Sequence, residues 1–458
     1  MKERINTEIF KAYDIRGIYP SEIGEEGVYK IASAFCDFIK PKEVVIGGDV
    51  RLSTPALKKA AIKAIASRGI KVIDVGTIST DMLYFAVANY GYAGGFSITA
   101  SHNPGEHNGM KFVREDSKPI SSDTGLFDIR EIAVNNEASV SGYELSEKEE
   151  SLVEEKNILD DYIAKIKTFA DFSKFKTFKI VANPNFGAGG KAVDKLLENT
   201  GIEIIKLNWQ PDGNFPKGRP DPLAPENRKE ISERVMEEKA DFGVAWDADA
   251  DRCFFFTEKG EFIEGYFITA LLAKIFLEKN PGTKIIHDPR LIWAIDDIAK
   301  ENGGTSIVTK SGHAFIKERM RKENAIFGGE MSAHYYFRDY FYCDNGLIPL
   351  VIMLEFLSKQ DKTLSEIMRE MFWNKYFVSG EINNTVYDVP TVIAKVKEIY
   401  IKDAESISEI DGVSIERADW RFNLRGSNTE PVIRFNVEAK TKELMEQKRE
   451  EVLKIIRG

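Results

Sequence analysis

Residues 44–99 read VVIGGDVRLSTPALKKAAIKAIASRGIKVIDVGTISTDMLYFAVANYGYAGGFSIT, and this stretch decides the fold class. Short runs rich in β-branched residues alternate with stretches whose apolar residues have helical spacing. The predicted strands are 44–46, 71–75 and 95–99, and the predicted helices are 55–68 and 82–90. Strands and helices that alternate in this way predict βαβ units, in which helices flank a mostly parallel sheet.

The same alternation recurs in two further blocks of the chain. The predicted strands there are 178–182, 201–207 and 241–246, and then 284–286, 306–308 and 325–327. The last block, from about residue 372, has longer strands at 415–418 and 431–438 among helices at 389–400 and 442–456, which predicts a smaller α+β domain. The Glu- and Ser-rich stretch 135–157 predicts a solvated helix or linker.

Length and composition indicate a packed, multidomain protein. The chain has 458 residues, 43% apolar and 30% charged, and a formal charge of −10. This acidic balance argues against nucleic-acid binding, and the apolar runs 267–277 and 347–357 are too short for a membrane span. The charged N-terminus lacks the apolar core of a signal peptide, and three distant cysteines make no disulfide framework. We therefore expect a cytoplasmic protein with no membrane partner.

The strand at 95–99 runs into Thr99-Ala100-Ser101-His102-Asn103-Pro104. A serine among small and polar residues at the carboxyl end of a strand is well placed to act as a nucleophile or to carry a phosphoryl group. The alternative is a Ser-Asn-Pro turn with no chemical role.

The strand at 242–246 runs into an acidic loop in which Asp247, Asp249 and Asp251 alternate with alanines. Carboxylates that close repel one another unless a cation neutralises them, and oxygen-only ligands favour Mg²⁺ over zinc. An EF-hand is disfavoured because Arg252 stands where that loop requires glycine and the flanks read as strands. A solvated acidic turn is the remaining alternative.

Two more loops offer groups that bind polar ligands. Residues 328–334 (GGEMSAH) present Glu, Ser and His, which suit sugar hydroxyls, although a plain β-turn explains them equally well. Residues 425–431 (RGSNTEP), with Arg434 beyond, combine arginines, short polar side chains and a glycine, as a phosphate cradle does; the alternative is a polar turn before an edge strand.

A possible nucleotide-binding motif, Gly-x-Gly-x-x-Ala at 187–192, is weak. No acidic residue ends the following strand to hold a ribose, and a P-loop is excluded by Asn185 and Ala192 at its first and last positions. The four polar loops together are the parts needed to move a phosphoryl group on a phosphorylated polyol.

In this order and spacing, the loops resemble the α-D-phosphohexomutase superfamily, most closely its phosphomannomutase/phosphoglucomutase branch. The resemblance covers nearly the whole chain and extends to motifs between the loops, namely 13–17 (YDIRG), 108–111 (NGMK), 215–216 (FP), 220–222 (PDP), 225–227 (PEN) and 311–313 (SGH). It implies three similar mixed-sheet α/β domains and a smaller C-terminal α+β domain around a central cleft. The implied domains are 1–148, 149–253, 254–371 and 372–458.

The resemblance also implies roles for individual residues. Ser101 would be the phosphoserine, and Asp247, Asp249 and Asp251 would hold Mg²⁺ with a phosphoserine oxygen. The residues implied near the transferring group are Arg16, Lys111, Arg252 and His313, with Lys111 and His313 as acid/base candidates. We expect cationic neighbours to lower the pKa of Lys111. The implied substrate-binding residues are Tyr13, His102, Arg252, Glu330, Ser332, His334, Arg425, Ser427, Asn428, Thr429 and Arg434.

The implied reaction interconverts hexose 1-phosphate and hexose 6-phosphate, of mannose and/or glucose, through a hexose 1,6-bisphosphate. Glucose 1,6-bisphosphate or mannose 1,6-bisphosphate would be the activator, sugar phosphates the partners, and the chain a monomer or homodimer. The alternatives are phosphoglucosamine mutase, a sugar-phosphate phosphatase and a non-enzymatic phosphosugar-binding paralogue. Two departures from the family are alanines at 248 and 250, where glycine is common, and the segment 287–290 (HDPR), which differs where the family touches the sugar.

Overall fold

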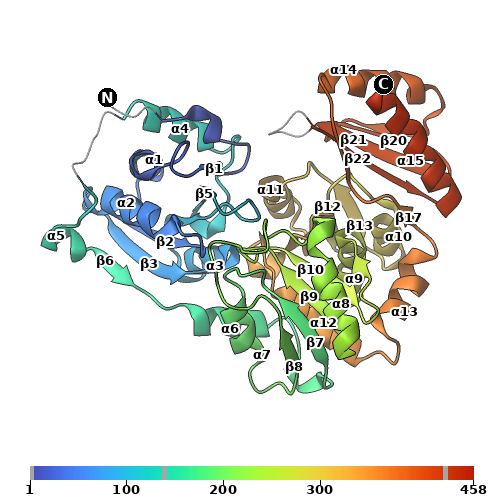
Figure 1. The fold of residues 1–458 in the computed structure, drawn as a ribbon, viewed down its shortest axis with the longest axis horizontal. Coiled ribbons are helices and arrows are strands. Elements are labelled where there is room, and N and C mark those ends of the chain that lie inside the picture. The colour runs from blue at the N-terminus through green and yellow to red at the C-terminus, as the bar shows by residue number, and fades with distance from the viewer. Residues whose placement is uncertain (1–4, 137–141, 427–431) are drawn as a thin grey trace. The chain divides into compact units, whose positions relative to one another are not determined.

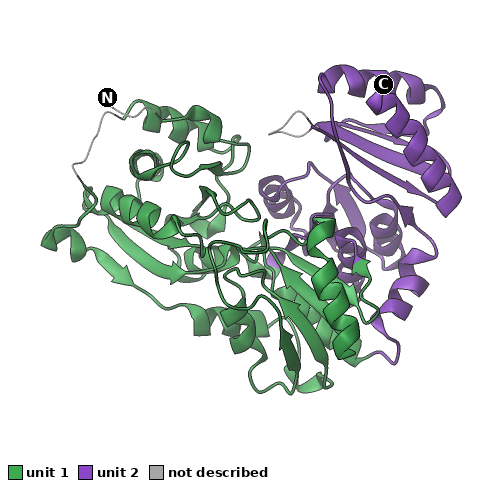
Figure 2. Ribbon diagram, in the orientation of Figure 1, with its two compact units in different colours: residues 1–262, 339–359 green, residues 263–338, 360–458 purple. Residues whose placement is uncertain are grey.

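The structure is a computed structural model of the chain, and it describes residues 5–136, 142–426 and 432–458. The chain forms two compact units (Figure 2). Unit 1 comprises residues 1–262 and 339–359, and unit 2 comprises residues 263–338 and 360–458. Among the described residues, no helix is both long and apolar enough to cross a membrane.

The N-terminal sheet of unit 1 has six strands in the order β1-β5-β4-β2-β3-β6. Figure 1 labels β1, β2, β3, β5 and β6 among them. Its strands are β1 (Ile15–Ile18), β2 (Glu43–Gly48), β3 (Lys71–Thr77), β4 (Gly94–Ile98), β5 (His107–Arg114) and β6 (Val153–Glu155). Its helices are α1 (Glu25–Ile39), α2 (Thr54–Ala66), α3 (Thr80–Tyr90), α4 (Leu126–Val134) and α5 (Glu147–Glu150). The pairs β4–β2, β2–β3 and β3–β6 are parallel, whereas β5 is antiparallel to both neighbours, so the sheet is mixed.

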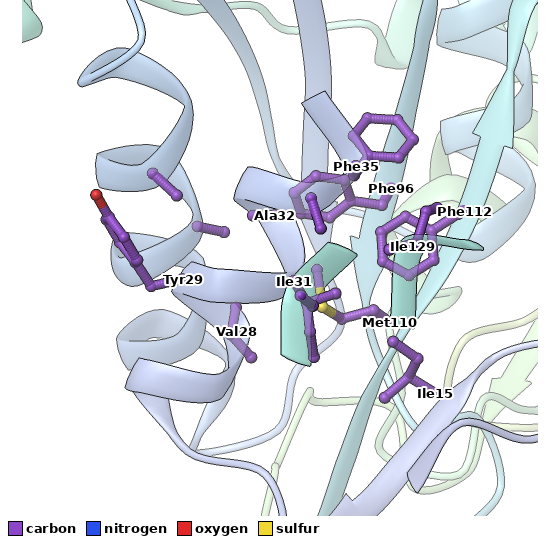
Figure 3. Packing of buried hydrophobic residues seen from close by; sticks show 14 of the residues in the cluster. Ile15, Val28, Tyr29, Ile31, Ala32, Phe35, Phe96, Met110, Phe112 and Ile129 are labelled. Atoms are coloured by element: carbon purple, nitrogen blue, oxygen red, sulfur yellow. The ribbon is translucent and has the colours of Figure 1, made fainter. Parts of the chain in front are cut away.

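Three phenylalanines pack together within the mainly aliphatic core of this sheet (Figure 3). Phe35 of α1 contacts Phe96 of β4 edge-on at 5.4 Å between ring centroids, and Phe112 of β5 packs on both rings at 5.3 Å. Edge-on and tilted aromatic pairs add to the stability from apolar burial. The packing anchors α1 on the two strands that flank the Ser101 loop.

The stretch 135–157 differs from the expected solvated helix or linker. Besides α5 it contains β6, which pairs in parallel with β3 at Val72↔Val153. Only Val153 of this three-residue edge strand is partly buried, and Glu154 forms a surface ion pair with Lys71. So short and polar an edge strand has no apolar alternation by which its sequence would reveal it. Residues 137–141 lie outside the described residues.

The second sheet of unit 1 has the order β11-β10-β9-β7-β8. Its strands are β7 (Lys179–Asn183), β8 (Glu203–Lys206), β9 (Phe242–Trp246), β10 (Cys253–Thr257) and β11 (Phe262–Ile263), with helices α6 (Leu159–Lys167), α7 (Gly190–Leu197) and α8 (Lys229–Glu238). β9 and β10 are antiparallel, with Trp246 opposite Cys253. The acidic loop is therefore the turn of a β-hairpin and not an EF-hand.

Residues 339–359 return the chain to unit 1 with β16 (Cys343–Asp344) and α12 (Ile348–Ser358). The Asn345 amide donates to the Asp81 carboxylate at 2.7 Å, and the Trp246 indole donates to the Gly346 carbonyl at 2.7 Å. These bonds connect residues 339–359 to helix α3, which follows β3, and to strand β9, which runs into the acidic loop.

Unit 2 begins with a third α/β sheet, in which β13, β12, β14 and β15 are hydrogen-bonded in that order. The strands are β12 (Lys284–His287), β13 (Thr305–Val308), β14 (Phe327–Gly329) and β15 (Tyr335–Phe337), and the helices are α9 (Gly265–Lys279), α10 (Trp293–Glu301), α11 (His313–Glu323), α13 (Leu364–Met368) and the π-helix η6 (Arg369–Trp373). Two parallel pairs and one antiparallel pair repeat the mixed pattern of unit 1.

The C-terminal part of unit 2 is an antiparallel sheet in the order β17-β22-β21-β20-β19, with β18 also paired to β22. Its elements are β17 (Phe377–Val378), β18 (Ile382–Thr385), β19 (Ser406–Ser408), β20 (Val413–Glu416), β21 (Trp420–Gly426), β22 (Val432–Ala439), α14 (Val389–Tyr400) and α15 (Lys442–Arg457). The 3₁₀ turns are η1 (Thr7–Ile9), η2 (Glu115–Ser117), η3 (Phe172–Lys174), η4 (Pro225–Asn227), η5 (Arg338–Tyr340) and η7 (Ile401–Asp403). The predicted fold class, with three mixed α/β sheets and a smaller α+β part, is confirmed.

Candidate active site

The loop after β4 presents Ser101 in a strained backbone conformation. Ser101 has a φ of 51°, in the left-handed region, and only 1% of its surface is exposed. Its hydroxyl donates to Oδ2 of Asp247 at 3.0 Å. A non-glycine residue in this region is destabilised by about 1–3 kcal/mol and keeps it only where its surroundings impose it. The loop therefore holds the hydroxyl against the acidic hairpin turn.

The three aspartates of that turn converge in a buried cluster. Asp247, Asp249 and Asp251 are at most 1% exposed, and each offers a carboxylate oxygen within 4.8 Å of the others. Thr80, the first residue of α3, donates its hydroxyl to Asp249 Oδ2 at 2.6 Å and its backbone N–H to the Asp249 carbonyl at 2.9 Å. Burial and the neighbouring Asp251 and Asp249 carboxylates raise the pKa of Asp247 well above its usual value. The cluster thus carries more negative charge than it can stabilise alone.

The two alanine spacers of this turn differ in conformation. Ala250 has a φ of 51°, so this position is one where glycine would be unstrained, whereas Ala248 has no such requirement. The turn at 187–190 packs directly on the spacers: Ala188 N–H donates to the Ala248 carbonyl at 2.9 Å, and a Cβ at Gly187 would lie 2.3 Å from that oxygen. The Gly-x-Gly-x-x-Ala motif is explained by this close approach.

Lys111 on β5 lies among carboxylates, contrary to the expectation of cationic neighbours. Its ammonium donates to Asp249 Oδ2 at 2.7 Å and to Asp251 Oδ2 at 2.6 Å. Burial lowers the pKa of Lys111, but the two carboxylates outweigh burial and raise it above its usual value. The predicted lowered pKa is wrong here because the residues that neutralise Lys111 are 138 and 140 positions away in sequence.

Further cations border the Ser101 loop. Arg16 on β1 donates to Asn103 Oδ1 at 2.7 Å and is held by Asp14. Arg252 donates to Nδ1 of His102 at 2.9 Å. Burial, with Arg252 and then Arg16, lowers the pKa of His102 well below its usual value, so its ring is neutral. Tyr13 is partly buried in the bend before β1.

The acidic cluster has the chemistry of a divalent-cation site. It offers three carboxylates with no nitrogen or sulfur ligand, and Oδ1 of the buried Asp249 has no hydrogen-bond partner among the described residues. Hard cations such as Mg²⁺ prefer this donor set. The residues therefore fit the cation that the sequence predicts.

In unit 2, the loop after β14 places Glu330, Ser332 and His334 together. The Glu330 carboxylate accepts from the Gly312 N–H at 2.7 Å and from the Tyr336 hydroxyl at 2.5 Å, and it lies 3.3 Å from His334 Nδ1. Burial opposes ionisation, but His334 and Arg290 outweigh it and lower the pKa of Glu330. Glu330 is therefore an ionised acceptor.

The same cluster includes residues from the segment that departs from the family pattern. Asp288 forms a paired contact with Arg290 and accepts from the Met331 N–H at 2.8 Å. Arg290 also lies 3.5 Å from the Ser332 hydroxyl. His313, which begins α11, follows Gly312, whose N–H bonds to Glu330.

Arg425 at the end of β21 and Arg434 on β22 lie opposite each other in the antiparallel pair. Both contact the carboxylate of Glu381, at 3.2 and 3.4 Å, and Arg290 contacts it at 3.4 Å. Burial opposes ionisation of Glu381, but the three guanidinium groups bring its pKa down to about 2. Ser427, Asn428 and Thr429, predicted to complete this phosphate cradle, lie outside the described residues.

Four family models match the chain in succession. They describe the phosphoglucomutase/phosphomannomutase α/β/α domains I, II and III, at residues 7–139, 160–260 and 264–376, and the C-terminal domain of the same proteins, at 381–455. The chain belongs to this family.

Relatives in the family cover nearly the whole chain. A phosphomannomutase from Escherichia coli K12 is 46% identical over 94% of each chain, and one from Vibrio cholerae is 47% identical over 98% of each. A phosphoglucomutase/phosphomannomutase family protein from Burkholderia thailandensis superposes with a TM-score of 0.86 at 28% identity, covering 99% of this chain and 98% of that one.

Three residues that matter to these sites were missed by sequence analysis. Arg51 and Asp49 contact the Ser101 loop, and Glu381 contacts the arginines of the C-terminal sheet. Asp49 and Arg51 follow β2 in the same way that Ser101 follows β4, so a polar loop at a strand end was the available signal. Glu381 precedes β18 without any such pattern, and only the folded chain brings it to Arg425.

Proposed function

We propose that the protein is a phosphohexomutase, an isomerase that interconverts hexose 1-phosphate and hexose 6-phosphate of mannose and/or glucose. The observation that carries the proposal is Ser101, whose buried hydroxyl lies 3.0 Å from an aspartate of a three-carboxylate cluster. Two relatives named phosphomannomutase, 46% and 47% identical over almost the full length, support the same reaction.

In this reaction Ser101 carries the phosphoryl group between the two sugar positions. The Ser101 O–P bond breaks as a bond forms from phosphorus to a sugar hydroxyl oxygen, whose proton passes to a base. Transfer then reverses from the other phosphate of the hexose 1,6-bisphosphate. Such transfer depends chiefly on in-line positioning and charge neutralisation. Asp247 orients the Ser101 hydroxyl, and the loop geometry aims its oxygen.

The residues around Ser101 supply the positive charge that the phosphoryl group needs. Arg16 and Arg252 flank the loop, and Lys111 is charged at the acidic cluster. Lys111 and His313 are the proposed acid/base residues, and the ion pairs with Asp249 and Asp251 hold the Lys111 ammonium in place. Asp247, Asp249 and Asp251 would hold Mg²⁺, which when bound neutralises charge on the transferring group.

Unit 2 would recognise the sugar and the phosphate that does not react. Ionised Glu330, with Ser332 and His334, suits sugar hydroxyls, and Arg425 with Arg434 suits phosphate oxygens. Ser427, Asn428 and Thr429 are proposed as further phosphate ligands, and Tyr13 and His102 as substrate contacts in unit 1. Since the bisphosphate must turn around between half-reactions, one clamp has to accept either phosphate.

We also propose the activator, the oligomeric state, the location and the domain bounds of the protein. Glucose 1,6-bisphosphate or mannose 1,6-bisphosphate is the proposed activator, and the chain is proposed to be a monomer or homodimer in the cytoplasm. The domain bounds 1–148, 149–253, 254–371 and 372–458 are proposed as well. Phosphoglucosamine mutase is the alternative activity. The loop sequence Gly-Glu-Met-Ser at 329–332 resembles the form found in glucose and mannose phosphate enzymes of the family rather than the glucosamine phosphate form, which usually has glutamine in place of Met331.

A coupled assay tests the proposal. The protein is incubated with Mg²⁺, a catalytic amount of glucose 1,6-bisphosphate, and either mannose 1-phosphate or glucose 1-phosphate, while formation of the 6-phosphate and release of inorganic phosphate are both followed. Conversion of either substrate supports the mutase, and the ratio of kcat/KM values identifies the hexose. Release of inorganic phosphate without isomerisation would indicate a phosphatase instead.

A further inference from the structure

Every N–H group of the Arg51 guanidinium donates a hydrogen bond, and most of these bonds go to the loop that carries Ser101. Arginine has five N–H donors, and here one bonds to Asp49 while the other four reach backbone carbonyl oxygens. Those acceptors are the carbonyls of Ser101 at 2.7 Å, Asn103 at 2.7 Å, Pro104 at 2.5 Å and His107 at 3.0 Å. No other side chain could offer four carbonyls a planar fork of donors.

Asp49 fixes Arg51 and reaches the other side of Ser101. Besides the Arg51 side chain, the Asp49 carboxylate accepts from the Arg51 N–H at 3.0 Å, the Thr54 hydroxyl at 2.9 Å and the Thr99 hydroxyl at 2.7 Å. The Thr99 oxygen in turn accepts from the Ser101 N–H at 2.9 Å. The N–H and the carbonyl of Ser101 are thus both tied to the Asp49–Arg51 pair.

The pair is shielded from water by a loop from the second sheet. Arg51 is 1% exposed, and the ring of Phe215 lies 5.1 Å from its guanidinium carbon. Gly213 forms a parallel bridge with Arg51, and a Cβ there would lie 2.3 Å from the Val50 carbonyl oxygen. Hydrogen bonds out of contact with water hold their geometry more strictly than exposed ones.

We propose that Arg51, held by Asp49, is a positioning residue that imposes the left-handed backbone of Ser101 and so aims its hydroxyl oxygen for phosphoryl transfer. The inference rests on the proposed function. Ser101 would relax toward an ordinary backbone conformation without a tether on each side, because its φ of 51° is unfavourable for serine. Relaxation would turn the oxygen away from Asp247 and leave the remaining substrate contacts of unit 2 intact.

The test uses the full-length protein and two variants with a matched control. Arg51→Lys keeps the charge but has too few donors for the four carbonyls. Thr99→Val removes the hydroxyl that links the Ser101 N–H to Asp49 and leaves Arg51 with all its donors. The control is Arg68→Lys, because Arg68 lies in the turn after α2 and bonds to the Ser33 hydroxyl and the Ala64 carbonyl, away from Ser101. Each protein is assayed for kcat, KM, thermal unfolding, and the rate at which glucose 1,6-bisphosphate phosphorylates Ser101, followed by intact-protein mass.

We expect Arg51→Lys to lower kcat and the Ser101 phosphorylation rate together by about 100-fold, as a 1 Å misplacement of a reacting group does. KM should stay within about threefold, and Arg68→Lys should match the wild type. Thr99→Val should lose about tenfold in both rates, which keeps the test decisive if Arg51→Lys does not fold. Wild-type rates in either folded variant, or a kcat loss equal to the unfolded fraction, would overturn the proposal. Failure of the wild type itself would instead refute the mutase assignment.

Discussion

Asp247→Asn separates the metal-binding role of the acidic cluster from its structural role. The cluster's carboxylate oxygens lie within 4.8 Å of one another. At an effective dielectric constant of about 20, each pair of full charges within that distance repels by at least about 3.5 kcal/mol. The substitution removes one charge, and therefore two of the three repulsions, while an amide oxygen can still accept from Ser101. Without metal, the variant should unfold at or above the wild-type temperature.

With Mg²⁺, the wild type should unfold at a higher temperature than Asp247→Asn. A cation that binds only the folded protein stabilises it by about 2.7 kcal/mol at one hundred times its Kd, or about 5 to 10 °C for a unit of this size. The wild type should gain this shift and Asp247→Asn should lose most of it. Thermal unfolding by circular dichroism, in EDTA and across a Mg²⁺ titration, measures both effects.

The control for this experiment is Asp160→Asn. Asp160 is 79% exposed on α6 and forms an ion pair with Lys195 at 3.7 Å. Because such surface pairs contribute little, its replacement should leave the unfolding temperature unchanged both in EDTA and in Mg²⁺. A wild type that gains no stability from Mg²⁺, or an Asp247→Asn variant that gains as much, would refute the reasoning about the cluster.

Four further substitutions test the proposed roles of Ser101, Lys111, Arg425 and Glu381. Ser101→Ala should abolish turnover, by at least about 1,000-fold, with an unchanged circular dichroism spectrum; normal activity would remove Ser101 from the mechanism. Lys111→Met should destabilise the protein in EDTA by about 3–5 kcal/mol, since two buried carboxylates lose their partner, and equal stability in urea unfolding would contradict this. Arg425→Ala should raise KM about 30- to 100-fold with a smaller effect on kcat; an unchanged KM would mean that the phosphate clamp is misassigned. Glu381→Gln should lower the free energy of unfolding at pH 7 by about 3 kcal/mol, because the folded pKa of about 2 lies below the ordinary 4.5. The difference in unfolding free energy between the wild type and Glu381→Gln should have its full size above about pH 5 and shrink as pH falls from 4.5 toward 2. A difference that grows as pH falls would be inconsistent with a depressed pKa.

Sequence patterns predicted those strands and loops whose residues are contiguous in the chain. The strand before Ser101 and the alternating aspartates were evident because apolar strands run directly into loops rich in polar residues. The strand β6 was not, because a three-residue polar edge strand carries no periodicity.

Ion pairs between residues distant in sequence were the second feature that sequence patterns did not predict. Lys111 was expected among cations, yet its neighbours are Asp249 and Asp251, and nothing in either segment reveals that contact. Glu381 and Arg425 are likewise 44 positions apart. Long-range ion pairs are set by the packing of whole sheets, so only the folded chain shows which charges meet.

In the proposed reaction, Ser101 accepts and returns the phosphoryl group of a hexose phosphate. Its most direct test is the intact mass of the purified protein after incubation with Mg²⁺ and glucose 1,6-bisphosphate, followed by addition of excess mannose 1-phosphate or glucose 1-phosphate. We expect a gain of one phosphoryl group on Ser101, exchange of that group with the added sugar phosphate, and neither event in Ser101→Ala. A protein that forms the 6-phosphate while Ser101 is never phosphorylated would contradict it.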